Sequence, residues 1–195
     1  MRLITIIFIA AFLQACAFTD ASIDVAHNPE TNTIGSLSEV EKVNFQTAVF
    51  ADNRKDKERI GYKKNGFGQN TADITTKDDV TNIVRSAVND AITDNNHTTS
   101  SNGDIKIVGT VDNFWLDTDI NFATVEFIGD IQCTIDFIET DTNKSIYKST
   151  YTGNHREKVL GGYIKTWEKV MNLTLDKLLE DVVNDEDLVE VLENR

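Results

Sequence analysis

The chain has 195 residues and carries 19 lysine and arginine side chains against 32 aspartate and glutamate side chains, a formal net charge of −13. Such an acidic surface repels polyanions and anionic lipid headgroups, so we expect no nucleic-acid partner. With 40% hydrophobic residues and a single proline, the composition is typical of one globular domain with its own core.

The N-terminus has the pattern of a bacterial lipoprotein signal peptide over residues 1–15. Arg2 supplies a positive charge, and an apolar run of eleven residues follows from Leu3 to Leu13. This run is shorter than the roughly 20 apolar residues that a membrane-spanning helix needs. Cys16 directly follows the sequence Leu-Gln-Ala, which predicts transfer of a diacylglyceryl group to its thiol and cleavage before it. A plain signal peptide and a buried N-terminal helix are the alternatives.

A lipid on Cys16 would hold a polar domain at a membrane, because two acyl chains anchor a protein stably where one does not. The next residues, Ala17 and Phe18, include no aspartate, which would resemble an inner-membrane retention signal of Gram-negative bacteria. We therefore expect an outer-membrane lipoprotein whose domain faces the periplasm. Cys133 then has no intramolecular partner, so the domain is expected to fold without a disulfide.

Residues 16–42 are polar and weakly patterned, which predicts a tether between lipid and domain with one short ordered piece near Ala21–Ala26. A single folded domain is expected over residues 43–195. Its first strand is predicted from the alternation of side chains between Val43 and Phe50, and Ile60-Gly61-Tyr62 is predicted as a second short strand.

Two helices are predicted from their apolar faces. The first can be capped by Thr75 or Thr76 and has apolar residues at helical spacing from Val80 to Ala91. The second is predicted from Tyr163 to about Val182, after Gly161-Gly162. A further turn or two is predicted at Leu188–Leu192.

Three strands are predicted between these helices, at residues 105–115, 123–137 and 146–155, with turns at Asp117–Asp119 and Asp141–Lys144. The middle strand keeps one apolar parity throughout, and its Gly129 is predicted to mark a bend or bulge. The order strand, helix, three strands, helix predicts an α+β fold. We expect an antiparallel sheet of about four strands with two amphipathic helices packed on one face.

Short motifs at these positions resemble the YajG family of uncharacterised bacterial lipoproteins. Asp52-Asn53-Arg54 resembles the family's Asp-x-Arg, Ile60-Gly61 resembles the apolar-glycine pair that follows, and the helix from Lys77 resembles its first helix. The resemblance covers residues 43–184, with a polar insertion at 98–103. It implies the same fold, an anchored envelope location and no established activity.

Motifs for catalysis or for a cofactor are weak. Gly61 and Gly66 have the spacing of a phosphate-binding loop, but Phe67-Gly68 stand where lysine and a hydroxyl residue are needed, so no nucleotide or other cofactor is expected. The three histidines have no zinc spacing, so no metal site is predicted. Cys133 lies on the apolar parity of its strand and is expected to be inert. We therefore expect a binding or accessory module and no enzyme. The alternative is an envelope hydrolase that uses His155 with a nearby carboxylate.

One local cluster departs from the acidic trend, and we call it the basic loop: Arg54, Lys55, Lys57, Arg59, Lys63 and Lys64. Arginine can bind a carboxylate or phosphate through two parallel hydrogen bonds, so Arg54, Arg59, Lys63 and Lys64 are predicted to receive an anionic ligand or an acidic partner. The partner is expected to be an envelope protein or a cell-wall component. The alternative is that Arg54 pairs with Asp52 and only fixes the loop.

Three aromatic residues flank the turn expected after residue 116. Phe114, Trp115 and Phe122 either cover an edge of the core or form a partner-binding patch.

Overall fold

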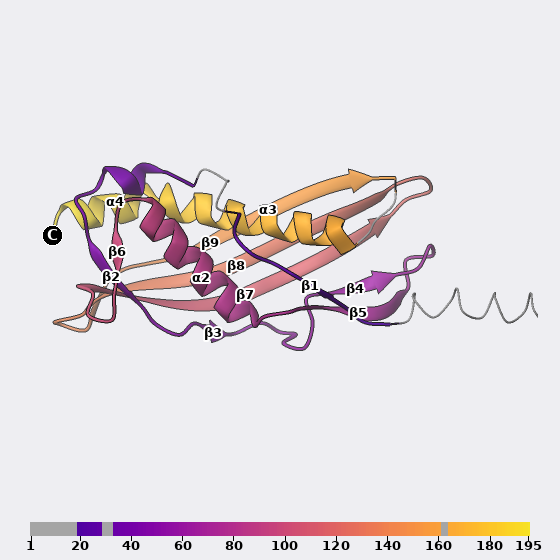
Figure 1. Ribbon diagram of the computed structural model, residues 1–195, viewed down its shortest axis with the longest axis horizontal. Helices are drawn as coiled ribbons and strands as arrows, with labels where there is room; N and C mark the ends of the chain where they lie inside the picture. Colours follow the sequence, from indigo (N-terminus) through magenta and orange to yellow (C-terminus); the bar gives the residue numbers. More distant parts are fainter. Residues whose placement is uncertain (1–18, 29–32, 161–163) are drawn as a thin grey trace, which may run out of the picture.

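The computed structural model describes residues 19–28, 33–160 and 164–195 (Figure 1). The predicted signal peptide at residues 1–15, the predicted lipidation site Cys16 and the Gly161-Gly162 pair lie outside the described residues. Within the described part of the chain, no helix combines the length and the apolar character that crossing a bilayer requires.

The described residues form a mixed sheet of nine strands, with helices across one of its faces (Figure 1). The strands are β1 (Ala21–Ile23), β2 (Asn44–Thr47), β3 (Ala51–Asp52), β4 (Gly61–Lys64), β5 (Asn70–Thr76), β6 (Thr98–Thr99), β7 (Ile105–Ile120), β8 (Val125–Glu139) and β9 (Lys144–Val159). The helices are the 3-10 helix η2 (Ser36–Glu39) and the α-helices α2 (Val80–Asp94), α3 (Ile164–Val183) and α4 (Glu186–Glu193).

The α+β class is confirmed, but the expected sheet of about four antiparallel strands is too small. Strands β7, β8 and β9 form the expected antiparallel meander. Along the other edge of β7, the short strands β2, β3 and β4 pair with it in parallel. β5 then pairs with β4, and β1 with β5. Several of these strands have only two to four residues, too few for side-chain alternation to reveal them in the sequence.

β7 is longer than predicted because a β-bulge resets its side-chain parity. The register with β8 shifts between Val111 and Asn113, so Asp112 is an extra residue. The odd-numbered residues face the core before the bulge, and the even-numbered residues Phe114 and Leu116 face it afterwards. The turn predicted at Asp117–Asp119 is therefore wrong. The chain turns instead after Ile120, where the Asn121 amide donates to the Thr124 carbonyl over 2.9 Å.

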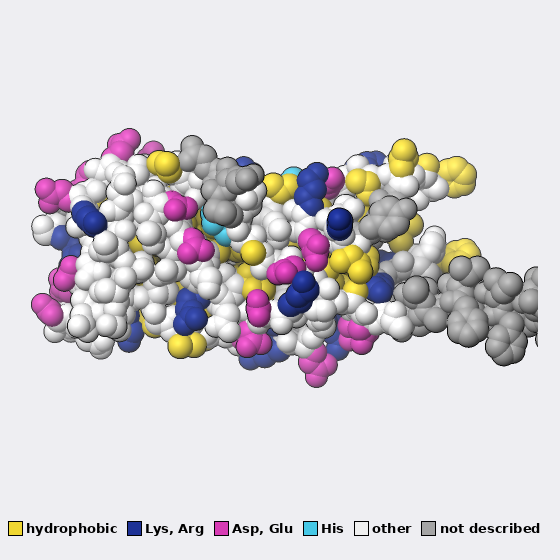
Figure 2. All heavy atoms as spheres, viewed as in Figure 1, with side chains coloured by type: hydrophobic (Ala, Val, Ile, Leu, Met, Phe, Trp, Pro, Cys, Tyr) yellow, Lys and Arg dark blue, Asp and Glu magenta, His cyan; other side chains and the backbone are white. Residues whose placement is uncertain are grey.

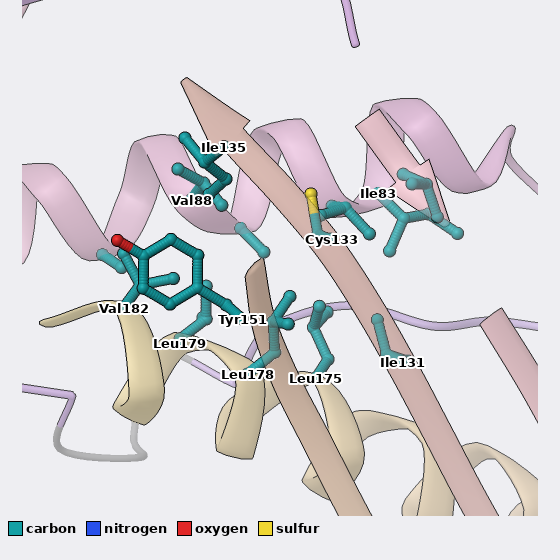
Figure 3. Packing of buried hydrophobic residues seen from close by; sticks show 14 of the residues in the cluster. Ile83, Val88, Ile131, Cys133, Ile135, Tyr151, Leu175, Leu178, Leu179 and Val182 are labelled. Atoms are coloured by element: carbon teal, nitrogen blue, oxygen red, sulfur yellow. The ribbon is translucent and has the colours of Figure 1, made fainter. Parts of the chain in front are cut away.

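The helices lie on the face of the meander that carries the apolar parity of β8. Figure 3 shows Ile131 and Cys133 of β8, Val88 of α2 and Leu178 of α3 within one buried cluster. The first helix begins one turn later than Thr76, because Asp79 occupies the N-cap position. The second helix and the short helix that follows lie where they were predicted.

Gly129 marks a close approach of helix and sheet, and the predicted bend or bulge is wrong. The pairing of β8 with both neighbours is continuous at Gly129. A Cβ atom added there would lie 2.0 Å from Thr174 Oγ1 of α3, and one added at Gly153 would lie 2.1 Å from the Thr174 carbonyl oxygen. The two glycines let the α3 backbone approach the sheet at this one position.

The described part of the segment expected to be a tether packs on the domain. β1 pairs in parallel with β5, and Leu37 of η2 is fully buried. Ala21, Ile23 and Val25 alternate with exposed residues, which is the period-two pattern of a half-buried strand. The ordered piece expected near Ala21–Ala26 is thus part of the sheet, and residues after it also pack on the core. The folded domain therefore begins before residue 43, where its start was expected.

The predicted first strand is also shorter than its alternation indicated. β2 ends at Thr47, Val49 is exposed, and Phe50 turns into the core. The ring of Phe50 occupies the space in front of Gly109 on β7, where a Cβ atom would lie 2.2 Å from Cε2 of Phe50.

Candidate functional site

Arg54 fixes the start of the basic loop from a buried position. Its Nε and one terminal nitrogen donate to the two carboxylate oxygens of Asp52 over 3.1 and 3.0 Å. Its guanidinium also donates to the carbonyl oxygens of Lys57 and Arg59, each over 3.1 Å. The salt-bridge alternative is therefore confirmed, and the guanidinium is occupied by the loop's own atoms.

The same pairing lowers the pKa of the Asp52 carboxyl. Burial by itself raises this pKa, but the hydrogen bonds and the positive charge of Arg54 outweigh it and favour the ionised form. The Asp52–Arg54 pair is thus a charged clamp across the base of the loop.

Arg59 is the second arginine of the basic loop, and it is also engaged within the protein. Its guanidinium lies 3.2 Å from carboxylate oxygens of Asp56 and of Asp73, and 3.0 Å from one of Glu58. One terminal nitrogen donates to the Tyr62 hydroxyl, and the guanidinium carbon lies 5.2 Å from the centre of the Tyr62 ring. Three carboxylates around one guanidinium leave Arg59 little capacity to attract a further anion.

Lys63 and Lys64 extend from β4, and both contact neighbouring segments. Nζ of Lys63 donates to the Thr19 carbonyl oxygen over 2.5 Å. Nζ of Lys64 lies 2.8 Å from the Asp117 carboxylate and 2.7 Å from the Thr118 carbonyl oxygen. Burial raises the pKa of Asp117, but Lys64 and a backbone amide lower it more, so the net pKa is below the usual value. The two predicted lysines thus hold β4 to the N-terminal segment and to β7.

Lys55 and Lys57 are the two cations of the basic loop whose ammonium groups make no ion pair or hydrogen bond within the described residues. Both side chains are exposed. They border a surface cavity of about 750 Å³, which lies between loop residues 54–59 and residues 112–115 of β7. The sequence prediction singled out the four cations that the protein uses internally and left aside the two that remain available.

The aromatic residues near this loop have separate roles. Phe114 is fully buried, whereas Trp115 is partly exposed and lines the cavity. The Trp115 ring contacts the Tyr62 ring edge-on, with 5.8 Å between centroids. Phe122 is exposed at the tip of the β7–β8 hairpin and is not among the residues that line this cavity. The Asp112 bulge is what directs Trp115 away from the core and toward the cavity.

A second surface cavity, of about 630 Å³, lies between β9 and the helices α3 and α4. The carboxylates in this cavity make hydrogen bonds within the protein. Asp185 accepts hydrogen bonds from the Tyr147 and Tyr151 hydroxyls and from two backbone amides at the start of α4. Asp181 accepts a hydrogen bond from the Thr152 amide of β9. These carboxylates join the edge strand to the C-terminal helices.

The residues considered for hydrolysis do not assemble a nucleophile. His155 lies 4.0 Å from Glu157, which pairs with Lys169 over 2.9 Å. No hydrogen bond joins His155 to a serine, threonine or cysteine in the ranges that the structure describes. Burial raises the pKa of the Cys133 thiol to about 12, so the nucleophilic thiolate is disfavoured.

His27, which the sequence prediction placed in the tether, has a buried side chain. Its Nδ1 atom lies 2.7 Å from the Asp176 carboxylate of α3, and its Nε2 atom lies 4.0 Å from Asp94 at the end of α2. Nearby on α2, the pKa of Asp90 is raised chiefly by burial of its carboxyl group. The alternation around Ile23 and Val25 was the one signal that this segment packs.

One solved structure shows that this fold occurs in another protein. A search of the curated proteins finds no match. A solved structure from Xanthomonas campestris is similar with a TM-score of 0.58 at 14% identity, over 88% of this chain and 96% of that one. A minor lipoprotein from Acinetobacter baumannii is similar with a TM-score of 0.45 at 11% identity, over 75% of this chain and 92% of that one. The family model of an uncharacterised lipoprotein, Lipoprotein_16, matches residues 37–193. As its resemblance to the YajG lipoproteins predicted, the chain belongs to this family of uncharacterised bacterial lipoproteins.

Proposed function

We propose that this protein is anchored by a lipid on Cys16 to the outer membrane, faces the periplasm, and binds an envelope partner without catalysing a reaction. Membership of a lipoprotein family and the sequence of residues 1–16 support the anchor. Neither His155, which lies 4.0 Å from Glu157, nor the buried Cys133 thiol, whose pKa is raised, is an activated nucleophile, which supports binding over the hydrolase alternative.

The anchor is tested by substituting Cys16. In a bacterium with lipoprotein processing, the wild-type chain should incorporate labelled palmitate, and Cys16→Ser should abolish the labelling and leave the chain unprocessed. Cys133→Ser is the matched control, since the same atom is changed at a buried site that cannot be acylated. Absence of label from the wild-type chain would refute the anchor.

The partner surface that we propose is the cavity beside the basic loop. The observation that carries this proposal is that four cations of the loop have partners within the protein, whereas Lys55 and Lys57 have none within the described residues. Arg54 and Arg59 hold the loop in place, so Lys55 and Lys57 extend from an ordered backbone, and their ammonium groups make no ion pair or hydrogen bond within the described residues. Trp115 adds a partly exposed aromatic face. Two lysines beside a tryptophan suit an acidic patch that also offers an apolar group.

The test uses a photo-crosslinking phenylalanine analogue at position 115 in intact cells. We expect a crosslinked product that weakens strongly in the Lys55→Glu/Lys57→Glu variant, because reversing both charges repels an acidic partner. The Lys144→Glu/Lys148→Glu variant carries the same change of charge on exposed lysines of β9 and should keep the product. Equal yields in the two double variants would contradict the assignment of the site.

The double reversal at Lys55 and Lys57 should not unfold the protein, because exposed charges contribute little to stability. Reversal of Arg59, Lys63 and Lys64 is a poorer test, since each of these side chains has internal partners. Its effects on folding and on binding would be mixed.

A further inference from the structure

Four of the six large hydrophobic side chains that are exposed in the described residues gather at one end of the molecule. They are Phe67 at 92%, Phe122 at 109%, Leu160 at 88% and Ile164 at 46% relative exposure. The other two, Ile34 and Val49, lie elsewhere. Figure 2 shows hydrophobic side chains at the right-hand end, on separate projections of the surface.

The sheet register explains why these residues come together. β4 runs parallel to the end of β7, with Gly61 beside Leu116, so the β4–β5 and β7–β8 hairpins project in the same direction (Figure 1). Val125 pairs with Val159, which places the end of β9 and Leu160 beside the β7–β8 tip. Helix α3 begins at this end with Ile164.

Both hairpin tips lack charged residues, in a chain of which 26% is charged. Residues 65–69 read Asn-Gly-Phe-Gly-Gln and residues 121–124 read Asn-Phe-Ala-Thr. The first tip, at residues 65–69, is also ordered by local hydrogen bonds. The Asn65 side chain accepts hydrogen bonds from the Phe67 and Gln69 amides, and Gly68 adopts a φ of 77°. The loop thus holds the Phe67 backbone in place while its ring is exposed to solvent.

The N-terminal segment leads to this same end. β1 is parallel to β5, with Ala21 beside Ile74, so the chain before Ala21 runs back along β5 toward the β4–β5 tip. The Asp20 carboxylate accepts a hydrogen bond from the Asp73 amide, and the Thr19 carbonyl from Lys63. Three peptide units then limit the distance from Thr19 to Cys16 to about 11 Å.

We propose that this end, which we call the tip face and define by Phe67, Phe122, Leu160 and Ile164, inserts into the surface of the bilayer that holds the lipid on Cys16. The inference rests on the proposed anchor. A lipid attached within about 11 Å of Thr19 keeps the tip face at the bilayer at high effective concentration. The exposed side chains then enter the interfacial region, where aromatic and aliphatic groups leave water.

The acidic character of the protein decides how this contact works. A net charge of −13 repels anionic headgroups, so the attraction is apolar and comes from uncharged tips. Membrane contact should therefore occur on zwitterionic lipid and should change little with salt. It also fixes the orientation of the molecule, with the β8–β9 hairpin and α4 directed away from the bilayer (Figure 1).

The test uses the full, lipidated chain in vesicles of phosphatidylcholine, with an environment-sensitive dye on a single introduced cysteine. Cys133 is buried and Cys16 would be acylated, so neither should react. The dye at Phe122→Cys should shift its emission to the blue and be quenched by brominated lipid. The dye at Thr142→Cys, exposed in the hairpin at the opposite end, should show neither effect.

A second variant separates insertion from mere proximity. With the dye at Phe67→Cys, the added change Phe122→Ser should reduce quenching by brominated lipid, because the neighbouring tip no longer inserts. Val49→Ser is the matched control, since Val49 is also highly exposed but lies between β2 and β3. Equal loss of quenching with both changes would overturn the proposal.

Emission, quenching and mass together distinguish a failure of the tip-face proposal from a failure of the proposed anchor. Water-like emission at both Phe122→Cys and Thr142→Cys, in a sample whose mass shows an acylated Cys16, would overturn the tip face and leave the anchor intact. A mass without acyl chains would refute the anchor itself. A blue shift without quenching by brominated lipid would mean that the tips contact protein, such as a second copy of this chain, and would also overturn the proposal.

Discussion

Nδ1 of His27 lies 2.7 Å from a carboxylate oxygen of Asp176, although 149 positions separate the two residues in the chain. Both side chains are 3% exposed, and the pair joins the N-terminal segment to the middle of α3. A hydrogen bond between buried groups contributes more to stability than one at the surface. It acts together with the bonds from the Asp24 and Ala26 amides to Glu168 and Asn172 of α3.

We expect His27→Ala to destabilise the protein by about 1–3 kcal/mol, because it removes a buried partner of a carboxylate and leaves space in the core. His155→Ala is the matched control, since that ring is 27% exposed and lies 4.0 Å from Glu157. Urea unfolding at neutral pH gives the free energies of unfolding. Equal losses in the two variants would show that the His27 pair does not secure the segment.

Gly129→Ala should destabilise the protein, because a new Cβ atom would lie 2.0 Å from Thr174 Oγ1. Overpacking of this kind typically costs about 1–3 kcal/mol. Since a side-chain atom causes the clash, Thr174→Ala should recover part of the loss. Gly66→Ala should be nearly neutral, as nothing lies within 4 Å of its Cβ position.

Gly153→Ala is the sharper comparison for the same contact. There the new Cβ atom would lie 2.1 Å from the Thr174 carbonyl oxygen, a backbone atom that substitution cannot remove. Thr174→Ala should therefore not rescue Gly153→Ala. If a double-mutant cycle gave equal coupling at both glycines, the approach of α3 to the sheet would be different from the one described.

The elements that could be predicted from sequence were those with many residues of one period. The parity of β8 holds from Phe127 to Phe137, and α2 repeats its apolar face over fifteen residues. The pairing of β1 with β5 was missed because it joins residues that lie far apart in the sequence, β1 has only three residues and β5 is mostly polar. The extra residue Asp112 was missed because the change of parity after it, at Phe114 and Leu116, was interpreted as the end of the strand.

The basic loop could be found by composition, but the roles of its residues could not. Arg54 and Lys55 are adjacent in sequence, yet one is 7% exposed and the other is free in solvent. The positions of carboxylates and carbonyl oxygens from several segments, among them Asp52, Asp73 and Asp117, decide which cations have partners within the protein. The number of charged residues in the loop does not reveal these positions.

Ile131→Ala tests the register of the central strand. Ile131 is fully buried between the sheet and α3, so truncation should cost about 2–5 kcal/mol. Gln132 has the opposite parity and lies on the face without helices, and Gln132→Ala should stay within roughly 0.5 kcal/mol. Thermal and urea unfolding of the two variants give the comparison, and similar effects would mean that the strand is shifted by one residue.

Acid should weaken the clamp at the base of the basic loop. Arg54 holds the pKa of the Asp52 carboxyl below its ordinary value, against the opposing effect of burial. In the unfolded chain this carboxyl titrates near its usual pKa of about 3.9, so the unfolded state binds more protons in the window below that value. The stabilisation is therefore complete above about pH 5 and is lost as the pH falls through the folded-state pKa.

The measurement is the free energy of unfolding of wild type and of Asp52→Asn as the pH is lowered from about 7 to about 3. The amide cannot ionise, so the stability difference between the two proteins should be largest at neutral pH and should shrink in acid. Arg54→Ala should likewise reduce the pH dependence, because Asp52 loses the cation that lowers its pKa. A difference between wild type and Asp52→Asn that stays constant across this range would show that the Asp52–Arg54 contact carries no charge-dependent stability.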